Sequence, residues 1–125
     1  LGEVLGCGGI VQELRRLRVG NWSVDQALPL ADLNMDTLGA AFVPMSQALP
    51  GLKSVLASPK EARLVGHGQI PRDIMSRLVF EQKQAYDQGQ SVVVKVVSQA
   101  GDLLALLAAE PGQGLKIKRV FRTLS

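Results

Sequence analysis

Four consecutive residues, Ser58-Pro59-Lys60-Glu61, constrain the fold of this chain more than any other segment. A serine followed three positions later by a glutamate is the pattern of a capping box, in which each side chain bonds the backbone of the other residue. Pro59 falls at the first helical position, where its missing N–H is not needed. The sequence therefore predicts a helix from here to about Val65, because Gly66 and Gly68 are suited to end it.

Three apolar stretches after this helix are predicted to be strands. Val92 to Val97 is a β-branched run, which favours a strand. The turn at Gln99-Ala100-Gly101-Asp102 leads into a second run, Leu103 to Ala109, so the two runs are interpreted as a hairpin. Leu115 to Arg122 is the last predicted strand, and residues 72–87 fit either a helix or an irregular excursion. One helix among several strands indicates an α+β fold.

The first third of the chain has shorter patterns. Leu1 to Leu5 is interpreted as the end of a helix, closed by the breaker Gly6-Cys7-Gly8-Gly9. A strand is predicted over residues 11–19 and a short β segment over residues 22–24. Residues 32–38 are predicted to form a short helix, and the proline-containing stretch that follows, to residue 52, is predicted to be a linker.

Composition excludes several classes of site. The chain has 125 residues, enough for one core and little more. Its single cysteine, Cys7, and single histidine, His67, cannot build a disulfide or a Cys/His metal cluster. No signal peptide is visible, and no apolar run approaches the length of a membrane span. We therefore expect no metal and no membrane contact, and a reduced, cytoplasmic location.

The distribution of charge is more informative than the net charge of +3. No acidic residue follows Glu110, whereas four cationic residues do: Lys116, Lys118, Arg119 and Arg122. Three arginines form a second cluster at positions 15, 16 and 18. Two local clusters suit contact with a polyanion. The alternative interpretation is that both are solvated strand faces.

Four segments, in the same order along the chain, resemble motifs of the TruB-type tRNA pseudouridine synthases. They are Leu5 to Arg16, Arg18 to Ala27, Glu61 to Gln69 and Leu115 to Phe121. The first is similar to the family's L-G-C-G-A-H-x-x-x-L-R-R, except that Gly9-Ile10 replaces Ala-His. The last is similar to L-K-P-K-R-V-F, with Ile117 in place of proline.

The resemblance implies a domain organisation. Residues 1–35 would be the C-terminal remnant of a mixed α/β catalytic domain, and residues 36–52 a linker. Residues 53–125 would be a PUA-like RNA-binding domain, a small β pseudo-barrel with one capped helix.

The resemblance also implies an activity. The family isomerises the T-loop uridine of tRNA with an aspartate and no cofactor, and its partner is tRNA, through the T-arm and the acceptor stem with its CCA end. The family's aspartate motif, G-x-L-D-P, lies upstream of the first segment. The nearest local analogue contains Asp102, which we interpret as a turn residue. We therefore assign no catalytic residue and expect this chain to bind RNA without catalysing a reaction.

Nine residues are candidates for the site. By resemblance, Leu14 packs beneath the target base, although a plain core leucine is the alternative, and Arg15 and Arg16 contact RNA. The turn His67, Gly68 and Gln69 is expected to offer free backbone N–H groups, a ring for stacking and an amide. Finally, the side chains of Lys116, Lys118 and Arg119 are expected to contact phosphates beside that turn.

Two other functions remain open from the sequence. One is a stand-alone PUA-type module of another RNA-modifying or ribosome-associated protein. The other is a protein-interaction domain that docks through the apolar hairpin. The sequence upstream of Leu1 would distinguish the first of these from a synthase.

Overall fold

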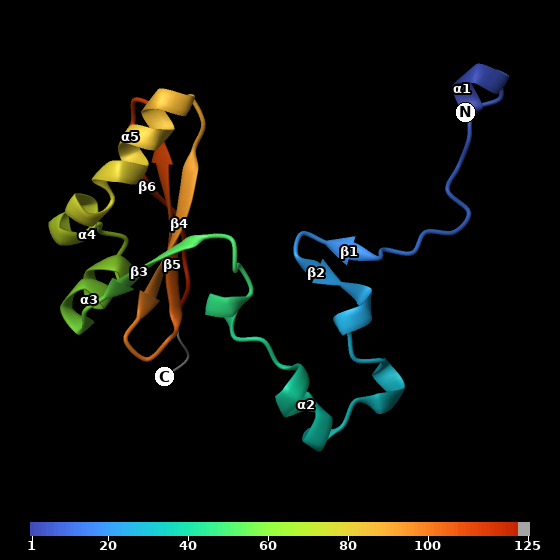
Figure 1. Cartoon of the computed structure of the whole chain (residues 1–125), viewed down its shortest axis with the longest axis horizontal. Helices are drawn as coiled ribbons and strands as arrows, with labels where there is room; N and C mark the ends of the chain where they lie inside the picture. The colour runs from blue at the N-terminus through green and yellow to red at the C-terminus, as the bar shows by residue number, and fades with distance from the viewer. Residues whose placement is uncertain (123–125) are drawn as a thin grey trace. The chain divides into compact units, whose positions relative to one another are not determined.

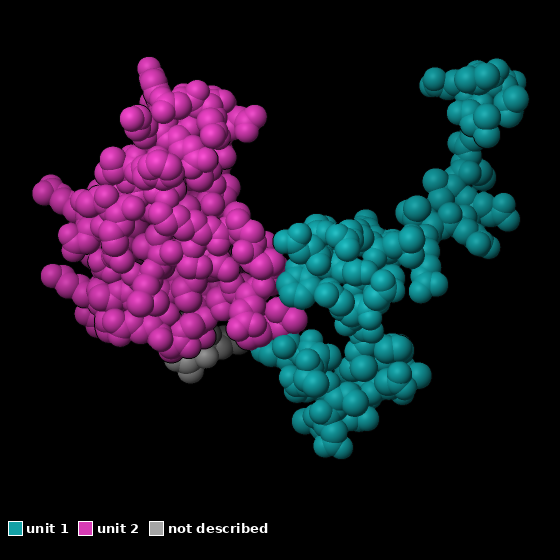
Figure 2. All heavy atoms as spheres, viewed as in Figure 1, with its two compact units in different colours: residues 1–42 teal, residues 43–125 magenta. Residues whose placement is uncertain are grey.

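The computed structural model describes residues 1–122. It divides into two compact units, Leu1–Phe42 and Val43–Ser125, here called unit 1 and unit 2 (Figure 2). This boundary falls inside the stretch interpreted as a linker, residues 36–52. Each unit is described by itself.

Unit 1 consists of short elements without a core. None of residues 1–42, all of which are described, is buried. The elements are α1 (Gly2–Leu5), β1 (Arg18–Val19), β2 (Trp22–Ser23), the 3-10 helices η1 (Val24–Gln26) and η2 (Leu30–Asp32), and α2 (Met35–Ala41). β1 and β2 form a two-stranded antiparallel ribbon.

The predicted ends of two helices in unit 1 can be compared with the structure. α1 ends as expected, with Gly6 in the left-handed region at φ 75°. The helix predicted over residues 32–38 is present but begins at Met35. Asn34 sets this start, because its side chain accepts hydrogen bonds from the N–H groups of Asp36 and Thr37, both 2.9 Å.

The strand predicted over residues 11–19 is wrong for residues 11–17. Only Arg18–Val19 pairs, with Trp22–Ser23. A strand needs a neighbour to satisfy its backbone N–H and C=O groups. Within the described chain the partner strand β2 is only two residues long, so pairing does not extend over residues 11–17.

Unit 2 contains a four-stranded sheet (Figure 1). Its elements are η3 (Met45–Gln47), β3 (Lys53–Ala57), α3 (Pro59–Gly66), α4 (Arg72–Arg77), α5 (Val79–Gln88), β4 (Val92–Ser98), β5 (Leu103–Glu110) and β6 (Gly114–Val120). The strand order is β3-β4-β5-β6. β3 and β4 run parallel, and the other two pairs are antiparallel. In the described residues, β3 and β6 are therefore the edge strands.

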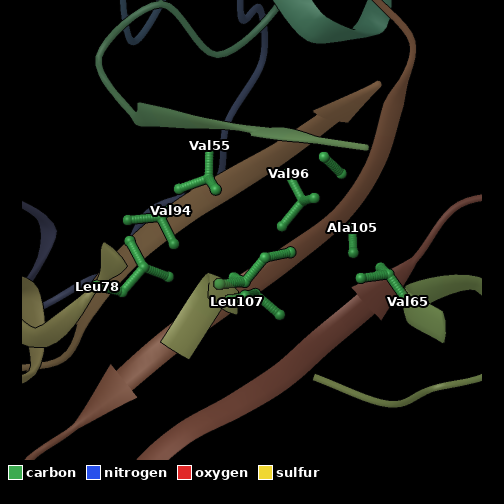
Figure 3. Packing of buried hydrophobic residues seen from close by; sticks show 9 residues of the cluster. Val55, Val65, Leu78, Val94, Val96, Ala105 and Leu107 are labelled. Carbon is green, nitrogen blue, oxygen red and sulfur yellow. The ribbon is translucent and has the colours of Figure 1, made fainter. Parts of the chain in front are cut away.

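The connection between the parallel strands carries all three α-helices to one face of the sheet. Val65 of α3, Ile74 of α4 and Leu78, which lies between α4 and α5, are fully buried in one cluster with Val94 and Leu107 of the strands. Figure 3 shows Val65 and Leu78 beside Val94 and Leu107. The sheet supplies one apolar face and the helices cover it, which is the usual two-layer solution for a small domain.

The structure confirms the α+β class and the main elements of unit 2. Of its three described α-helices, α3 is the one that begins with a side-chain cap. Ser58 Oγ accepts a bond from the Glu61 N–H (3.3 Å), and Glu61 Oε2 accepts one from the Ser58 N–H (2.8 Å). The hairpin of β4 and β5 is present, and residues 72–87 form α4 and most of α5, with Leu78 between the two helices.

Candidate functional site

The helix-ending turn at His67, Gly68 and Gln69 is exposed. Gly68 takes φ 79°, a conformation that favours glycine. The backbone N–H groups of the turn bond back to the last carbonyls of α3. Gly68 N–H donates to Val65 O and Gln69 N–H to Leu64 O, both 2.9 Å, and His67 N–H also donates to Leu64 O, at 3.1 Å.

The expectation that this turn offers free backbone donors is therefore wrong. A helix leaves its last carbonyls without partners, and a left-handed glycine lets the following N–H groups fold back onto them. The sequence correctly predicted that glycines end α3. It did not indicate that the N–H groups of the turn would be occupied by hydrogen bonds to the carbonyls of α3. What the turn still presents to a ligand is the imidazole of His67 and the amide side chain of Gln69, both exposed.

Two cationic residues of β6, Lys116 and Arg119, share one face because of a β-bulge. Lys116 lies opposite Ala108 and Arg119 lies opposite Leu106, with a shift of register between them. Leu106 and Ala108 are two positions apart on β5, so their partners point to the same side. That side is opposite the core face, to which α3 packs. The structure therefore does not place Lys116 and Arg119 on the sheet face that carries the helix-ending turn.

The cations of β6 differ in what they already contact. Lys118 Nζ lies 2.7 Å from Glu110 Oε1. Hydrogen bonds from Lys118 and then from Ser91, whose hydroxyl lies 3.0 Å away, lower the pKa of Glu110 below its ordinary value. Lys116 Nζ donates to the side-chain oxygen of Gln113. The side chain of Arg119 has no hydrogen bond or ion pair within residues 1–122, which leaves it available for an external anion.

A shallow hollow lies where α3 ends and β6 ends. Its volume is about 280 Å³, and its lining residues are Ala62, Gly66, Leu104, Val120, Phe121 and Arg122. The Phe121 N–H donates to Leu104 O at 2.8 Å, which prolongs the β5–β6 ladder and fixes the backbone beside the hollow. The helix-ending region and the end of the last strand therefore meet at this hollow, through Gly66 and Arg122.

Phe121 and Arg122 were not among the residues proposed from the sequence. Arg122 could have been found, because it belongs to the run of cations after Glu110. Phe121 had a weaker signal, as the last residue of the segment that resembles the family's closing strand. An aromatic ring and a guanidinium beside a glycine are groups that an unpaired nucleotide can contact.

The site residues proposed in unit 1 lie on an exposed chain. Leu14 is 85% exposed, and Arg15 is also exposed, so the structure shows neither packed against a wall. Arg16 lines an open hollow of about 220 Å³ together with Arg18 and Trp22.

Three further features of residues 1–122 concern metal binding, Asp102 and membrane spans. No three of their His, Cys, Asp or Glu side chains gather into a group that could hold a metal ion. Asp102 is an exposed turn residue, as expected, and its N–H donates to Ser98 Oγ at 3.1 Å. None of the helices in this part of the chain combines the length and apolarity that crossing a membrane requires.

Comparisons of this sequence with a protein-family model and with known proteins point to the same family. Residues 1–49 match the family described as the tRNA pseudouridylate synthase B C-terminal domain. A tRNA pseudouridine synthase B of Bdellovibrio bacteriovorus is 37% identical over 127 aligned positions, which cover 98% of this chain. The chain is a TruB-type C-terminal segment.

Further TruB relatives match over shorter stretches. One from Solibacter usitatus is 37% identical over 85% of this chain, and one from Ralstonia pickettii is 40% identical over 55% of it. The chain spans 40%, 34% and 23% of the lengths of these three relatives. The resemblance read from the four motifs is therefore confirmed for a part of a TruB protein.

Proposed function

We propose that this chain is the tRNA-binding C-terminal part of a tRNA pseudouridine synthase that isomerises the T-loop uridine to pseudouridine. The observation that supports this most strongly is the single alignment that runs through both units, at 37% identity over 98% of the chain, with a tRNA pseudouridine synthase B. On this proposal, unit 2 contains the PUA-like RNA-binding domain, at residues 53–125, and residues 1–35 belong to the catalytic domain.

The proposed RNA contacts lie around the end of β6. His67 and Gln69 offer a ring and an amide to an unpaired nucleotide, and Gly68 keeps the turn small. Lys116, Lys118 and Arg119 offer charge to phosphates. The hollow between α3 and β6, lined in part by Arg122, lies beside the helix-ending turn, whereas Lys116 and Arg119 lie on the opposite face of the sheet, so an RNA that contacts both groups must pass round the end of β6.

The charges in this set are not equivalent. Arg119 and Arg122 can each form a bidentate pair with a phosphate, because a guanidinium presents a planar fork of donors. Lys118 must break its ion pair with Glu110 before it can bind a phosphate. We therefore expect the two arginines to contribute more to RNA affinity than Lys118 does.

We propose that the chain by itself forms no pseudouridine. It contains no G-x-L-D-P motif, and its nearest analogue, at Asp102, is a hydrogen-bonded turn. By family resemblance, Leu14, Arg15 and Arg16 would serve the active site only within a complete catalytic domain. We further propose that the reaction needs no cofactor or metal and takes place in the cytoplasm.

The match to a synthase over both units favours this proposal over a stand-alone PUA-type module. A module shared among unrelated proteins would show the similarity in unit 2 alone. Here the match to the TruB C-terminal family lies at residues 1–49.

Competition binding tests the proposal. Unmodified tRNA, a minihelix of the acceptor stem and T-arm with its CCA end, and an anticodon-arm hairpin would each compete for the 125-residue chain. We expect the minihelix to compete as well as whole tRNA and the anticodon arm to compete at least about tenfold less well, the effect of about 1.4 kcal/mol. Equal competition by all three RNAs would contradict the proposed T-arm and acceptor-stem contact, and no binding of any RNA would contradict an RNA-binding role.

A further inference from the structure

The sheet of unit 2 has one face away from the helices, which we call the outer face. Lys95 lies on it, because its neighbours along β4 belong to the core and side chains alternate along a strand. Sheet pairing extends this row across all four strands, through Ser54, Lys95, Leu106 and Arg119. Lys116 lies on the same side, because it pairs with Ala108, two positions from Leu106.

The outer face carries more positive than negative charge. Lys116 and Arg119 are exposed, and neither takes part in an ion pair within residues 1–122. Among the residues of β3 to β6, all of which the structure describes, Glu110 is the one acid, and Lys118 already forms an ion pair with it. The ammonium of Lys95 bonds neutral backbone carbonyls. The outer face is therefore suited to an anion.

The outer face offers no ring on which a base could stack. None of the residues of β3 to β6, every one of which is described, is aromatic. Sheets that bind single-stranded RNA use aromatic side chains to stack its bases. In paired RNA the bases are stacked on one another, and protein contacts go mainly to phosphates and 2′-hydroxyls. The outer face therefore fits the backbone of a duplex better than unpaired bases.

The two exposed cations of this face are spaced along the strand. Their partners on β5, Leu106 and Ala108, are two residues apart, which separates the two backbone positions by about 7 Å. Arg119 offers a planar fork of donors and Lys116 a point charge. Lys116 has a neutral partner, the side chain of Gln113, which it can exchange for a phosphate without breaking an ion pair. Two phosphates of one RNA strand can therefore be contacted together.

The side of the sheet that carries α3 has different groups. The helix-ending turn exposes the imidazole of His67 and the amide of Gln69. Val120 and Phe121 line the hollow beside it. A ring, an amide and a small hollow suit an unpaired nucleotide. Arg119 and Val120 are neighbours in β6, so the change from one side of the sheet to the other takes a single residue.

We propose that β6 divides the bound RNA between the two sides of the sheet. The outer face holds the backbone of paired RNA through Lys116 and Arg119. The side with the helix-ending turn holds the unpaired nucleotides that follow the duplex. The junction between paired and unpaired RNA then lies at the C-terminal end of β6. This inference rests on the RNA-binding function proposed above and adds which part of the RNA each side contacts.

Binding of three RNAs to the 125-residue chain across a salt series tests this division. The first is the minihelix of the acceptor stem and T-arm with its unpaired CCA end. The second is the same minihelix without its unpaired 3′ nucleotides, and the third is a short unpaired oligonucleotide that ends in CCA. One double variant, Lys116→Ala with Arg119→Ala, changes the outer face. Another, His67→Ala with Gln69→Ala, changes the helix-ending turn.

The two double variants should act on different RNAs. We expect the outer-face variant to reduce the slope of log affinity against log salt by about 1.8 for both minihelices, the effect of two phosphate contacts, and to leave binding of the oligonucleotide unchanged. The turn variant should leave binding of the blunt minihelix unchanged. It should weaken binding of the minihelix with the CCA end at least about fivefold, the lower limit for stacking of one base on an aromatic ring.

The control Arg72→Ala with Lys83→Ala removes two exposed charges from α4 and α5 and should preserve both patterns. If the outer-face variant weakens the oligonucleotide as much as the minihelices, or changes no binding at all, the inference is wrong, and in the second case the cations only protect an edge strand. Lys116→Gln with Arg119→Gln repeats the measurement should the alanine variant unfold. Failure of the unaltered chain to bind any of the three RNAs would instead contradict the proposed function.

Discussion

The cationic residues of β6 differ in whether they already have an ion-pair partner, and the sequence does not reveal this difference. Lys116, Lys118 and Arg119 look equivalent in the sequence, but Lys118 is bound to Glu110, while Arg119 has no such partner in residues 1–122. Their positions in the sheet also differ, because a bulge adds one residue to β6 between Ile117 and Arg119. A bulge depends on the pairing of two strands, so neither strand alone predicts it.

The pair of Glu110 and Lys118 gives a prediction about pKa. Hydrogen bonding to Lys118 is the largest cause that lowers the pKa of Glu110 below 4.5, and the charge of Lys116 is the smallest. In Lys118→Ala, we expect the pKa of Glu110 to rise toward 4.5, and in Lys116→Ala, to change little. NMR titration of the Glu110 carboxyl carbon measures both. Equal shifts in the two variants would show that general charge, and not the contact, lowers the pKa.

The sign of the effect on stability follows. A carboxyl whose pKa is lower in the folded state stabilises that state above its unfolded pKa, and this contribution disappears as pH falls through the folded value. Lys118→Ala should therefore lower the unfolding free energy at neutral pH. The difference from the wild type should disappear as acidification protonates Glu110.

Among the elements, α3 is the one that its sequence determines most completely. Ser58 and Glu61 form its start, and Gly68 allows its ending, as predicted. Both ends of α3 could be predicted from the sequence because each is closed by hydrogen bonds between residues about four positions apart. β3 was not predicted, because its pairing partner, β4, is supplied from far along the chain. The same dependence on a partner explains why residues 11–17 are not a strand.

The capping box gives a prediction about the stability of unit 2. Replacing Ser58 by alanine removes the acceptor for the Glu61 N–H and should lower the unfolding free energy by about 1 kcal/mol. Ser76→Ala in α4 is a matched control, because its hydroxyl only bonds the carbonyl of Arg72, at 3.0 Å, within the helix. That change should stay within about 0.5 kcal/mol. Chemical denaturation measures both, and equal losses would mean that the box does not stabilise α3.

At the scale of the whole chain, the two units differ in what holds them together. Unit 2 has a core of buried side chains from strands and helices, whereas residues 1–42 bury none. The family resemblance and the charge pattern proposed candidate residues in unit 1, in the helix-ending turn and on β6, and these remain predictions. The sequence did not show that the backbone N–H groups of the helix-ending turn already bond carbonyls of α3. Nor did it show that Phe121 and Arg122 line a hollow, because that hollow forms only where the end of α3 packs beside the end of β6.

Hydrogen exchange should separate the two units. Amides of residues 1–35 are expected to exchange much faster than those of β4 and β5, because few buried contacts oppose local opening. Mass spectrometry of a sample first shown to be monomeric would follow both sets of amides. Uniform protection would contradict the picture of a unit without a core.

The salt dependence of binding to the acceptor-stem and T-arm minihelix tests the proposed RNA site most directly. Each phosphate contact on a duplex contributes about 0.9 to the slope of log affinity against log salt. Removing Arg119 and Arg122 together by alanine substitution should therefore reduce the slope by about 1.8 and weaken binding at low salt. Arg72→Ala with Lys83→Ala removes the same charge from α4 and α5 and should leave the slope nearly unchanged. Equal reductions in the two double variants would show that the RNA responds only to overall charge, and would contradict a site at the end of β6.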